Sequence, residues 1–265
     1  SETISEVGGF SVTLNNGKRT YLIETSQKGI EWMKLTASGV ASHGSMINPN
    51  NAVTKLANAV AKIGSYKWPQ RLTKTNEIFF KKIAELSGKP YDVNNLAPLL
   101  DEVGSISRMV GATLHNTANP SMLEAGYKAN VVPQNATAVV DGRTLPGYEK
   151  ELLATIKELV GPEIQVESLV SDIALEVDFD TPLVAKMIEA INSEDPEGVV
   201  IPYLLSGGTD NKALAKLGIT GYGFSPLKLP TDIDFTALFH GIDERVPIDS
   251  LHFGARTLHH FLVNA

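Results

Sequence analysis

Two histidines lie among small residues in expected loops, where an imidazole ring is accessible to a ligand. His240 precedes Gly241 and a run of two acids and a base, between a strand and the last helix. A neutral imidazole is a common zinc ligand that neighbouring carboxylates can orient. His43 joins a strand to a helix, where a histidine can stabilise an oxyanion or act as a general acid. Taken alone, His240 fits a surface histidine equally well, and His43 fits one better, because a catalytic zinc needs three protein ligands.

Residues 206–210, with the sequence SGGTD, follow an apolar strand and contain a glycine pair. The backbone amides of Gly207 and Gly208 can approach a ligand closely and bind an anionic oxygen. The alternative is a tight turn in which Thr209 or Asp210 caps the next helix. Without further context, the turn is the better interpretation.

An arginine and an asparagine stand near the two ends of an expected strand. Arg143 follows the strand at residues 135–141, and its planar guanidinium can grip a carboxylate. The commoner alternative is a salt bridge to Asp141. Asn130 can present its side-chain amide to the same ligand, or it can simply begin a turn.

The composition excludes several classes of function. The 265 residues carry a net charge of −7, which gives no electrostatic basis for nucleic-acid binding. With no cysteine, the chain has neither disulfides nor a thiol nucleophile, and this fits a reducing cytoplasm. No apolar run is long enough to span a membrane, and no targeting segment is visible. Because the sequence begins without a methionine, we expect the natural start to lie upstream of Ser1.

The first two-thirds of the chain predict an α+β unit. An Asn-Gly turn within residues 10–24 indicates a hairpin, and residues 29–38 continue in strand-like composition. A helix is predicted from Asn48-Pro49 to Gly64. Further helices are expected at 73–86 and 152–160, and further strands at 135–143 and 163–170. Residues 29–170 therefore predict an antiparallel sheet with helices on one side.

The last third has a different rhythm. Helices and strands alternate here: a helix after Thr181-Pro182, a strand at 199–205, the loop 206–210, a short helix and another strand. Such alternation indicates the α/β class with a mostly parallel sheet, in which ligands bind beyond the carboxyl ends of the strands. The segment after Ser171 is therefore predicted to differ in class from residues 29–170.

These segments, in this order, resemble the M20 family of zinc metallopeptidases and deacylases, which includes carboxypeptidases, desuccinylases and aminoacylases. The similarity covers nearly the whole chain. It rests on 41–45 (ASHGS), 130–133 (NVVP), 141–147 (DGRTLPG), 207–210 (GGTD) and 240–245 (HGIDER).

The resemblance implies a two-zinc catalytic domain that hydrolyses amide bonds in peptides or N-acyl amino acids. It also implies a lid, inserted into that domain, that forms a homodimer. The lid would be residues 29–170, with a four-stranded antiparallel sheet, and residues 1–28 and 171–265 would belong to the catalytic domain. The resemblance further implies that His240 and Glu6 are zinc ligands and that His43 reaches the partner's active site to stabilise the oxyanion. Asn130 and Arg143 would bind the substrate's carboxylate. Gly208 and Thr209 would also contact the substrate.

The family's His-x-Asp pair, bridging Asp and Glu-Glu pair would lie before Glu6, and this sequence does not contain them. Those residues supply most of the zinc ligands and generate the hydroxide nucleophile. We therefore expect this chain to be part of a longer enzyme and to be inactive alone. The alternative is a non-catalytic dimerisation or binding fragment.

Overall fold

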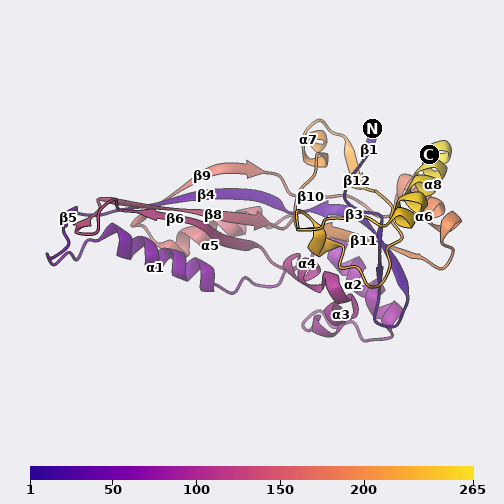
Figure 1. Ribbon diagram of the computed structural model, residues 1–265, viewed down its shortest axis with the longest axis horizontal. Helices are drawn as coiled ribbons and strands as arrows, with labels where there is room; N and C mark the ends of the chain where they lie inside the picture. The colour runs from indigo at the N-terminus through magenta and orange to yellow at the C-terminus, as the bar shows by residue number, and fades with distance from the viewer. The chain divides into compact units, whose positions relative to one another are not determined.

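The computed structural model describes residues 1–265, which divide into two compact units (Figure 1). Unit 1 contains Ser1–Lys28, Leu72–Leu114 and Leu175–Ala265, and unit 2 contains Gly29–Arg71 and His115–Ala174. The predicted inserted range 29–170 therefore needs correction, because its middle segment belongs to unit 1. The reason is packing, since helix α2 (Lys74–Ser87) buries its apolar side chains in a core of unit 1.

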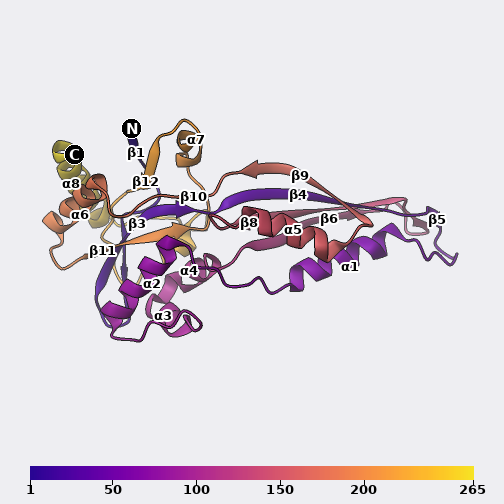
Figure 2. The same ribbon diagram turned by 180° about the vertical axis from the view of Figure 1, so that it is seen from behind.

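Unit 2 is the predicted antiparallel sheet with both of its long helices on one face (Figures 1 and 2). The strand order is β6-β8-β4-β9, so β6 and β9 are the edges. Met33, Leu35 and Val140 point into the core with the helices, whereas the side chains between them line the open face. The elements are β4 (Gly29–Ser38), β6 (Thr117–Ala125), β8 (Asn135–Thr144), β9 (Ile164–Asp172), α1 (Ala52–Ser65) and α5 (Glu149–Val160).

Helix α1 begins three residues after its predicted start. Asn51 is the N-cap, since its side-chain oxygen accepts hydrogen bonds from the amides of Val53 and Thr54. Asn48, the predicted cap, instead donates to the Val40 carbonyl at 2.7 Å and to the Ser42 hydroxyl at 2.9 Å. The capping residue type was correct, but Asn48 serves to close the loop that carries His43.

Unit 1 has a six-stranded sheet built around β3 (Arg19–Gln27). The α/β class is confirmed, although the sheet is mixed where a mostly parallel one was expected. Strands β1 and β12 are parallel, as are β11 and β3, whereas β2, β10 and β12 pair with β3 in antiparallel fashion. The predicted Asn-Gly hairpin accounts for the β2–β3 pair. The other strands are β1 (Glu2–Ser5), β2 (Phe10–Thr13), β10 (Leu175–Glu176), β11 (Val199–Leu205) and β12 (Thr220–Gly223).

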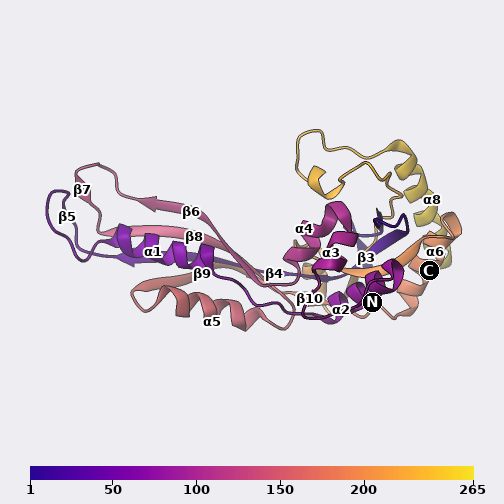
Figure 3. The same ribbon diagram turned by 90° about the horizontal axis from the view of Figure 1, so that it is seen from below.

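Helices cover both faces of this sheet because successive residues of β3 point to opposite sides. Leu22 packs with α2 in one core, whereas Tyr21 and Ile23 pack with α6 and α8 in the other. Figure 3 shows α6 and α8 side by side. The helices that remain to be placed are α3 (Ala97–Glu102), α4 (Ser107–Ala112), α6 (Pro182–Glu194), α7 (Asn211–Ala215) and α8 (Ile248–Asn264). None of the helices is both long and apolar enough to cross a bilayer.

Glycines allow an unusually close approach where β1 and β12 end. A Cβ atom on Gly223 would lie 1.6 Å from the Val7 carbonyl oxygen, so no other residue fits there. Gly8 faces the same contact with a φ of 132°, a conformation that glycine adopts readily. The contact fixes the path of the chain immediately after Glu6, and thereby the direction in which that segment leaves the sheet.

Candidate functional site

A cavity of about 570 Å³ in unit 1 brings together three residues that were singled out from the sequence. Glu6, Gly208 and His240 all line it, although more than 230 residues separate the first from the last. Glu244, from the same loop as His240, adds a second carboxylate. The structure thus assembles an imidazole, two carboxylates and a glycine backbone around one space. Imidazole and carboxylate are side-chain types that bind catalytic metal ions.

Each of these residues follows an element that fixes its position. Glu6 comes directly after β1, and Gly208 comes after β11, at the carboxyl end where ligands of α/β sheets bind. His240 follows the short 3-10 helix Thr236–Leu238. The sequence prediction of a ligand loop at 206–210 is consistent with this position.

His240 has a strained backbone. Its φ is +55°, in the left-handed region that residues other than glycine seldom occupy, even though Gly241 comes next. Asp243 in the same loop has a φ of +61°. Such conformations cost on the order of 1 kcal/mol or more, and they cluster at functional sites. The strain favours a role for the imidazole over the interpretation as an ordinary surface histidine.

Aromatic and aliphatic side chains form the walls of this cavity. The Phe235 ring lies 5.5 Å from that of Phe10 and 5.1 Å from that of Phe239, measured between centroids. Leu227 and Leu251 also line the space. An apolar wall beside a few polar groups is the usual construction of a small-molecule site. This wall suits a ligand with an apolar side chain or acyl group.

Thr209 is not among the lining residues, but it anchors the glycine loop. Gln27 donates from Nε2 to the Thr209 hydroxyl at 2.6 Å, and the Thr209 amide donates to Gln27 Oε1 at 3.0 Å. The Asn211 amide also donates to that hydroxyl. With two donors on its oxygen, the Thr209 hydroxyl keeps its own hydrogen available for a further acceptor.

Glu24 is a buried acid that sequence reasoning missed. It is 1% exposed, and Gln27 Nε2 donates to its Oε2 at 3.0 Å. Burial raises its pKa to about 8, hydrogen bonds from Gln27 and Asn211 oppose the rise, and the charge of Glu6 adds to it. The only sequence signal was a polar run, Glu-Thr-Ser-Gln, inside a strand otherwise expected to be apolar.

Replacing Glu24 by Gln should change how stability depends on pH. Because the folded-state pKa exceeds the unfolded value, unfolding releases a proton between about pH 4.5 and pH 8, and stability falls as pH rises through that window. Gln cannot titrate, and its side-chain oxygen can still accept from Gln27 Nε2. The variant should gain about 1 to 3 kcal/mol over wild type at pH 8.

Urea denaturation at pH 5 and pH 8 measures this effect. The gain should shrink at pH 5, where wild-type Glu24 carries its proton in the folded state. Glu24→Ala is the control. It removes the oxygen that accepts from Gln27 Nε2, so a buried donor loses this partner, and the protein should be less stable at both pH values. An equal effect of Glu24→Gln at both pH values would show that Glu24 is ionised in the fold.

In unit 2 the structure brings His43 and Asn130 together. Strand β5 (Ser42–His43) pairs with β7 (Val131–Val132), and His43 lies opposite Val131. The Gly44 amide donates to the Asn130 carbonyl at 2.9 Å. Both side chains are exposed, so this short ribbon presents an imidazole and an amide next to each other.

The contacts of His43 favour one tautomer. The Ser45 hydroxyl lies 2.8 Å from Nδ1 and the Ser45 amide lies 3.3 Å from it, and both contacts form hydrogen bonds when Nδ1 is the acceptor. In a neutral ring the proton then resides on Nε2. The ring of this exposed residue then has an N–H donor at Nε2, and stabilisation of an oxyanion requires such a donor.

Arg143 is paired with an acid of its own strand. Its Nε and Nη2 donate to the two oxygens of Asp141 at 2.7 and 3.0 Å, and Trp32 donates to the same carboxylate at 3.2 Å. This is the salt bridge that the sequence left open as an alternative. Arg143 also lies eight residues beyond Asn135 on β8, a path of roughly 26 Å. Within unit 2 it is therefore remote from the His43–Asn130 ribbon.

The residues present only partly fit a zinc site. Glu6 and His240 have suitable donor chemistry and line one cavity, but nowhere do three or more histidine, cysteine, aspartate or glutamate side chains form a group able to hold a metal. A catalytic zinc usually takes three protein ligands. Further donors would have to complete the site.

The chain is similar to known peptidases and to hydrolases of N-acyl amino acids. Residues 25–165 match the M20_dimer family, described as a peptidase dimerisation domain. The chain is 26% identical to the probable carboxypeptidase S-like 2 of Dictyostelium discoideum, over 92% of this chain and 51% of that protein. It is also 26% identical to the N-fatty-acyl-amino acid synthase/hydrolase PM20D1 of Xenopus tropicalis, over 87% and 46% respectively. The chain thus spans about half the length of the curated relatives it matches.

The fold has solved counterparts. The M20 family metallo-carboxypeptidase Sso-CP2 from Sulfolobus solfataricus superposes with a TM-score of 0.64 at 19% identity, covering 98% of this chain and 62% of that one. The aminopeptidase PepT from Bacillus cereus superposes with a TM-score of 0.59 at 16% identity, covering 98% and 55%. Since the dimerisation-domain match alone extends over more than half of the 265 residues, this chain belongs to the M20 family of peptidases.

Proposed function

We propose that the protein containing this chain is a zinc-dependent hydrolase of amide bonds in peptides or N-acyl amino acids. The observation that carries the proposal is the cavity shared by Glu6, Gly208 and His240. Its aromatic wall suits an apolar group beside the scissile amide. Relatives named as a carboxypeptidase and as N-fatty-acyl-amino acid hydrolases support the same class of reaction.

In this proposal the residues divide between metal and substrate. Glu6 and His240 hold zinc, which when bound lowers the pKa of water and polarises a carbonyl. Gly208 presents backbone to the substrate, and Thr209 offers its hydroxyl hydrogen. His43 donates from Nε2 to the developing oxyanion, with Asn130 beside it to hold the substrate.

We further propose a homodimer formed through unit 2, in which His43 serves the partner's site. Strand β6 has a free edge next to α1, and it exposes Met122 (52%) and Leu123 (58%). An exposed apolar edge is a ready surface for pairing, and a two-fold axis uses the same patch twice. A cytoplasmic location, consistent with the lack of cysteine, is part of the same proposal.

A second candidate is a non-catalytic dimerisation or binding fragment. The observation in its favour is that only two metal donors line the cavity together with the glycine loop and one further acid. Hydrolysis of N-acyl amino acids by protein purified from its natural source, abolished by a chelator and restored by zinc, would establish the enzyme. Stable dimers without hydrolysis or stoichiometric zinc would establish the fragment.

Arg143 is proposed to bind the substrate's free carboxylate in place of Asp141. Each hydrogen bond to a charged group contributes ~1.5 to 3 kcal/mol, so the two-pronged guanidinium of Arg143 should bind a free acid more tightly than its amide. Arg143→Lys keeps the charge but loses the fork, and it should raise KM with a smaller effect on kcat. Arg143→Ala should remove this arginine's contribution to the acid preference, measured by kinetics on a matched acid and amide.

The salt bridge to Asp141 supplies the competing explanation, in which Arg143 only stabilises the sheet. Thermal melts of the same variants provide the control. If Arg143→Ala melts at a lower temperature and still distinguishes acid from amide as wild type does, the residue belongs to the fold and not to the site.

A further inference from the structure

Gln27, the last residue of β3, is fully buried and contacts the glycine loop at 206–210. Its Oε1 accepts from the Thr209 amide at 3.0 Å. Its Nε2 donates to the Thr209 hydroxyl at 2.6 Å and to Glu24 Oε2 at 3.0 Å. Both hydrogens on the nitrogen and the oxygen of this side chain thus have partners. Gln27 therefore joins a buried acid of the sheet to the loop that reaches the cavity.

An irregularity in β3 brings Gln27 next to Glu24. Tyr203 and Leu205 of β11 are two residues apart, so they share one face of the sheet, and both pack in the same core. Glu24 pairs with Tyr203 and Gln27 pairs with Leu205, so β3 has one residue more than β11 over this stretch. In a regular strand, residues three apart point to opposite faces. The extra residue places Glu24 and Gln27 on the same face, which is how a β-bulge redirects a side chain.

The neighbours of Gln27 fix the direction of its amide group. The Thr209 amide is a donor, so it requires the oxygen of Gln27, and the nitrogen then lies toward Glu24. The Thr209 hydroxyl consequently accepts from Gln27 Nε2, and it also accepts from the Asn211 amide at 3.2 Å. Because these two donors occupy its lone pairs, the hydroxyl directs its own hydrogen to another acceptor.

A buried lysine packs against the same loop. A Cβ atom on Gly208 would lie 2.9 Å from both Cε and Nζ of Lys212, so a side chain there would displace the ammonium group. Lys212 is 3% exposed, and its Nζ donates to the Lys28 carbonyl at 2.6 Å, directly after Gln27 in the chain. The loop is therefore bonded at Thr209 by Gln27 and packed at Gly208 by Lys212.

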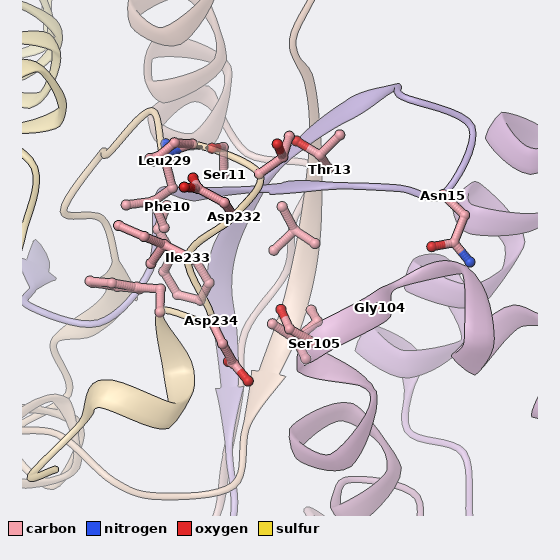
Figure 4. A pocket seen from close by; sticks show the side chains of 15 residues that line it. Phe10, Ser11, Thr13, Asn15, Gly104, Ser105, Leu229, Asp232, Ile233 and Asp234 are labelled. Carbon is pink, nitrogen blue, oxygen red and sulfur yellow. Dashed lines mark hydrogen bonds between the residues drawn. The ribbon is translucent and has the colours of Figure 1, made fainter. Parts of the chain in front are cut away.

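An aromatic wall of the cavity is held in a different way. Phe10 and Phe235, whose ring centroids are 5.5 Å apart, line this cavity and also a neighbouring one of about 300 Å³. Figure 4 shows Phe10 together with Asp232 and Ile233 around the neighbouring space. Ring packing holds this wall, whereas hydrogen bonds to one buried side chain hold the glycine loop. A change at Gln27 should therefore alter the loop and leave the wall as it is.

We propose that Gln27 is a positioning residue for the reaction. Its two hydrogen bonds to Thr209 hold the glycine loop at the cavity and set the Thr209 hydroxyl as a donor to an oxygen of the substrate. Glu24 supports this arrangement, because it holds the Gln27 amide in one orientation. The inference rests on the proposed function, since it names the residue that orients one contact to that substrate.

Exchanging the two side chains, in the double variant Glu24→Gln/Gln27→Glu, tests the direction of these hydrogen bonds. A glutamine at 24 can donate to a glutamate at 27, which can still accept from the Thr209 amide, so the melting temperature should stay close to that of wild type. These two donors favour the ionised carboxylate. A carboxylate cannot donate to the Thr209 hydroxyl and instead accepts its hydrogen. In the active enzyme, the exchange should raise KM roughly tenfold with a smaller change in kcat.

Two further variants complete the kinetic test. Thr209→Val keeps the shape and loses the hydroxyl, so it should raise KM by a similar factor, whatever the stability of the double variant. Adding the exchange to Thr209→Val should then cost nothing more, because both act on one contact. Gln165→Glu makes the same chemical change at an exposed position of β9, and as the control it should leave KM unchanged.

Binding of N-acetyl-L-phenylalanine to the 265-residue chain, followed by NMR at the Gly208 amide, gives a readout that needs no turnover. The double variant should bind this probe roughly tenfold more weakly than wild type. No binding by wild type, or wild-type affinity in either the double variant or Thr209→Val, would overturn the positioning role. Weaker binding in both variants without any hydrolysis by the natural protein would support the role and count against the proposed function. Hydrolysis with a KM indifferent to the exchange and to Thr209→Val would do the reverse.

Discussion

Replacing His43 by Ala is expected to lower kcat by ~10²-fold or more in the active enzyme, the usual scale for losing one oxyanion donor. The structure supports this role through the tautomer. The Ser45 amide and hydroxyl both contact Nδ1, and when Nδ1 accepts from them the neutral ring carries its hydrogen on Nε2. His43→Gln, which retains a side-chain N–H donor, should recover part of the rate.

The same variant tests whether His43 acts in the partner's site. A His43→Ala protein mixed with one inactivated at Glu6 should regain activity, because one of the two sites in a heterodimer then has both an intact zinc ligand and an intact His43. Mass spectrometry of differently tagged subunits verifies the exchange. If exchange is complete and activity does not return, His43 acts within its own subunit or not at all.

Much of the fold could be predicted because periodicity and turn chemistry are local. The Asn-Gly hairpin, the strands at 29–38 and 135–143 and the helix that ends at Gly161 all formed where the sequence placed them. The division into units could not be predicted this way. Residues 72–114 look like a continuation of the inserted unit in sequence, and only the burial of Phe79 and Ile83 beside Leu22 assigns them to the other.

The site shows the same limit. His240 and the glycine loop were visible as motifs, because ligand residues in loops have recognisable neighbours. Glu24 was not, because it looks like any polar residue within a strand. Its environment is a buried hydrogen-bond network that includes Thr209 and Asn211, which are distant from it in the sequence. Arg143 was visible in the sequence as part of the motif DGRTLPG. The same motif contains Asp141, and in the structure Arg143 donates to that carboxylate.

Replacing His240 by Asn is expected to lower the zinc affinity of the active enzyme by more than 100-fold. Losing an outer-shell partner of a metal ligand already costs about 10- to 100-fold, and His240 is proposed to be a ligand itself. Asn is chosen because it tolerates the left-handed backbone that His240 adopts, with a φ of +55°. The substitution therefore removes the imidazole without disturbing the loop, and the melting temperature of the zinc-free protein should stay the same or rise slightly.

Zinc titration of the enzyme at pH 7, alongside a thermal melt without metal, measures both quantities. His252→Asn is the matched control: it removes an exposed histidine of α8 that does not line the cavity, and it should leave zinc affinity unchanged. The two readouts separate the possible roles of His240, because a purely structural histidine would change the melt and not the titration. Full zinc affinity in His240→Asn would exclude His240 from the metal site and leave its backbone strain without a functional explanation.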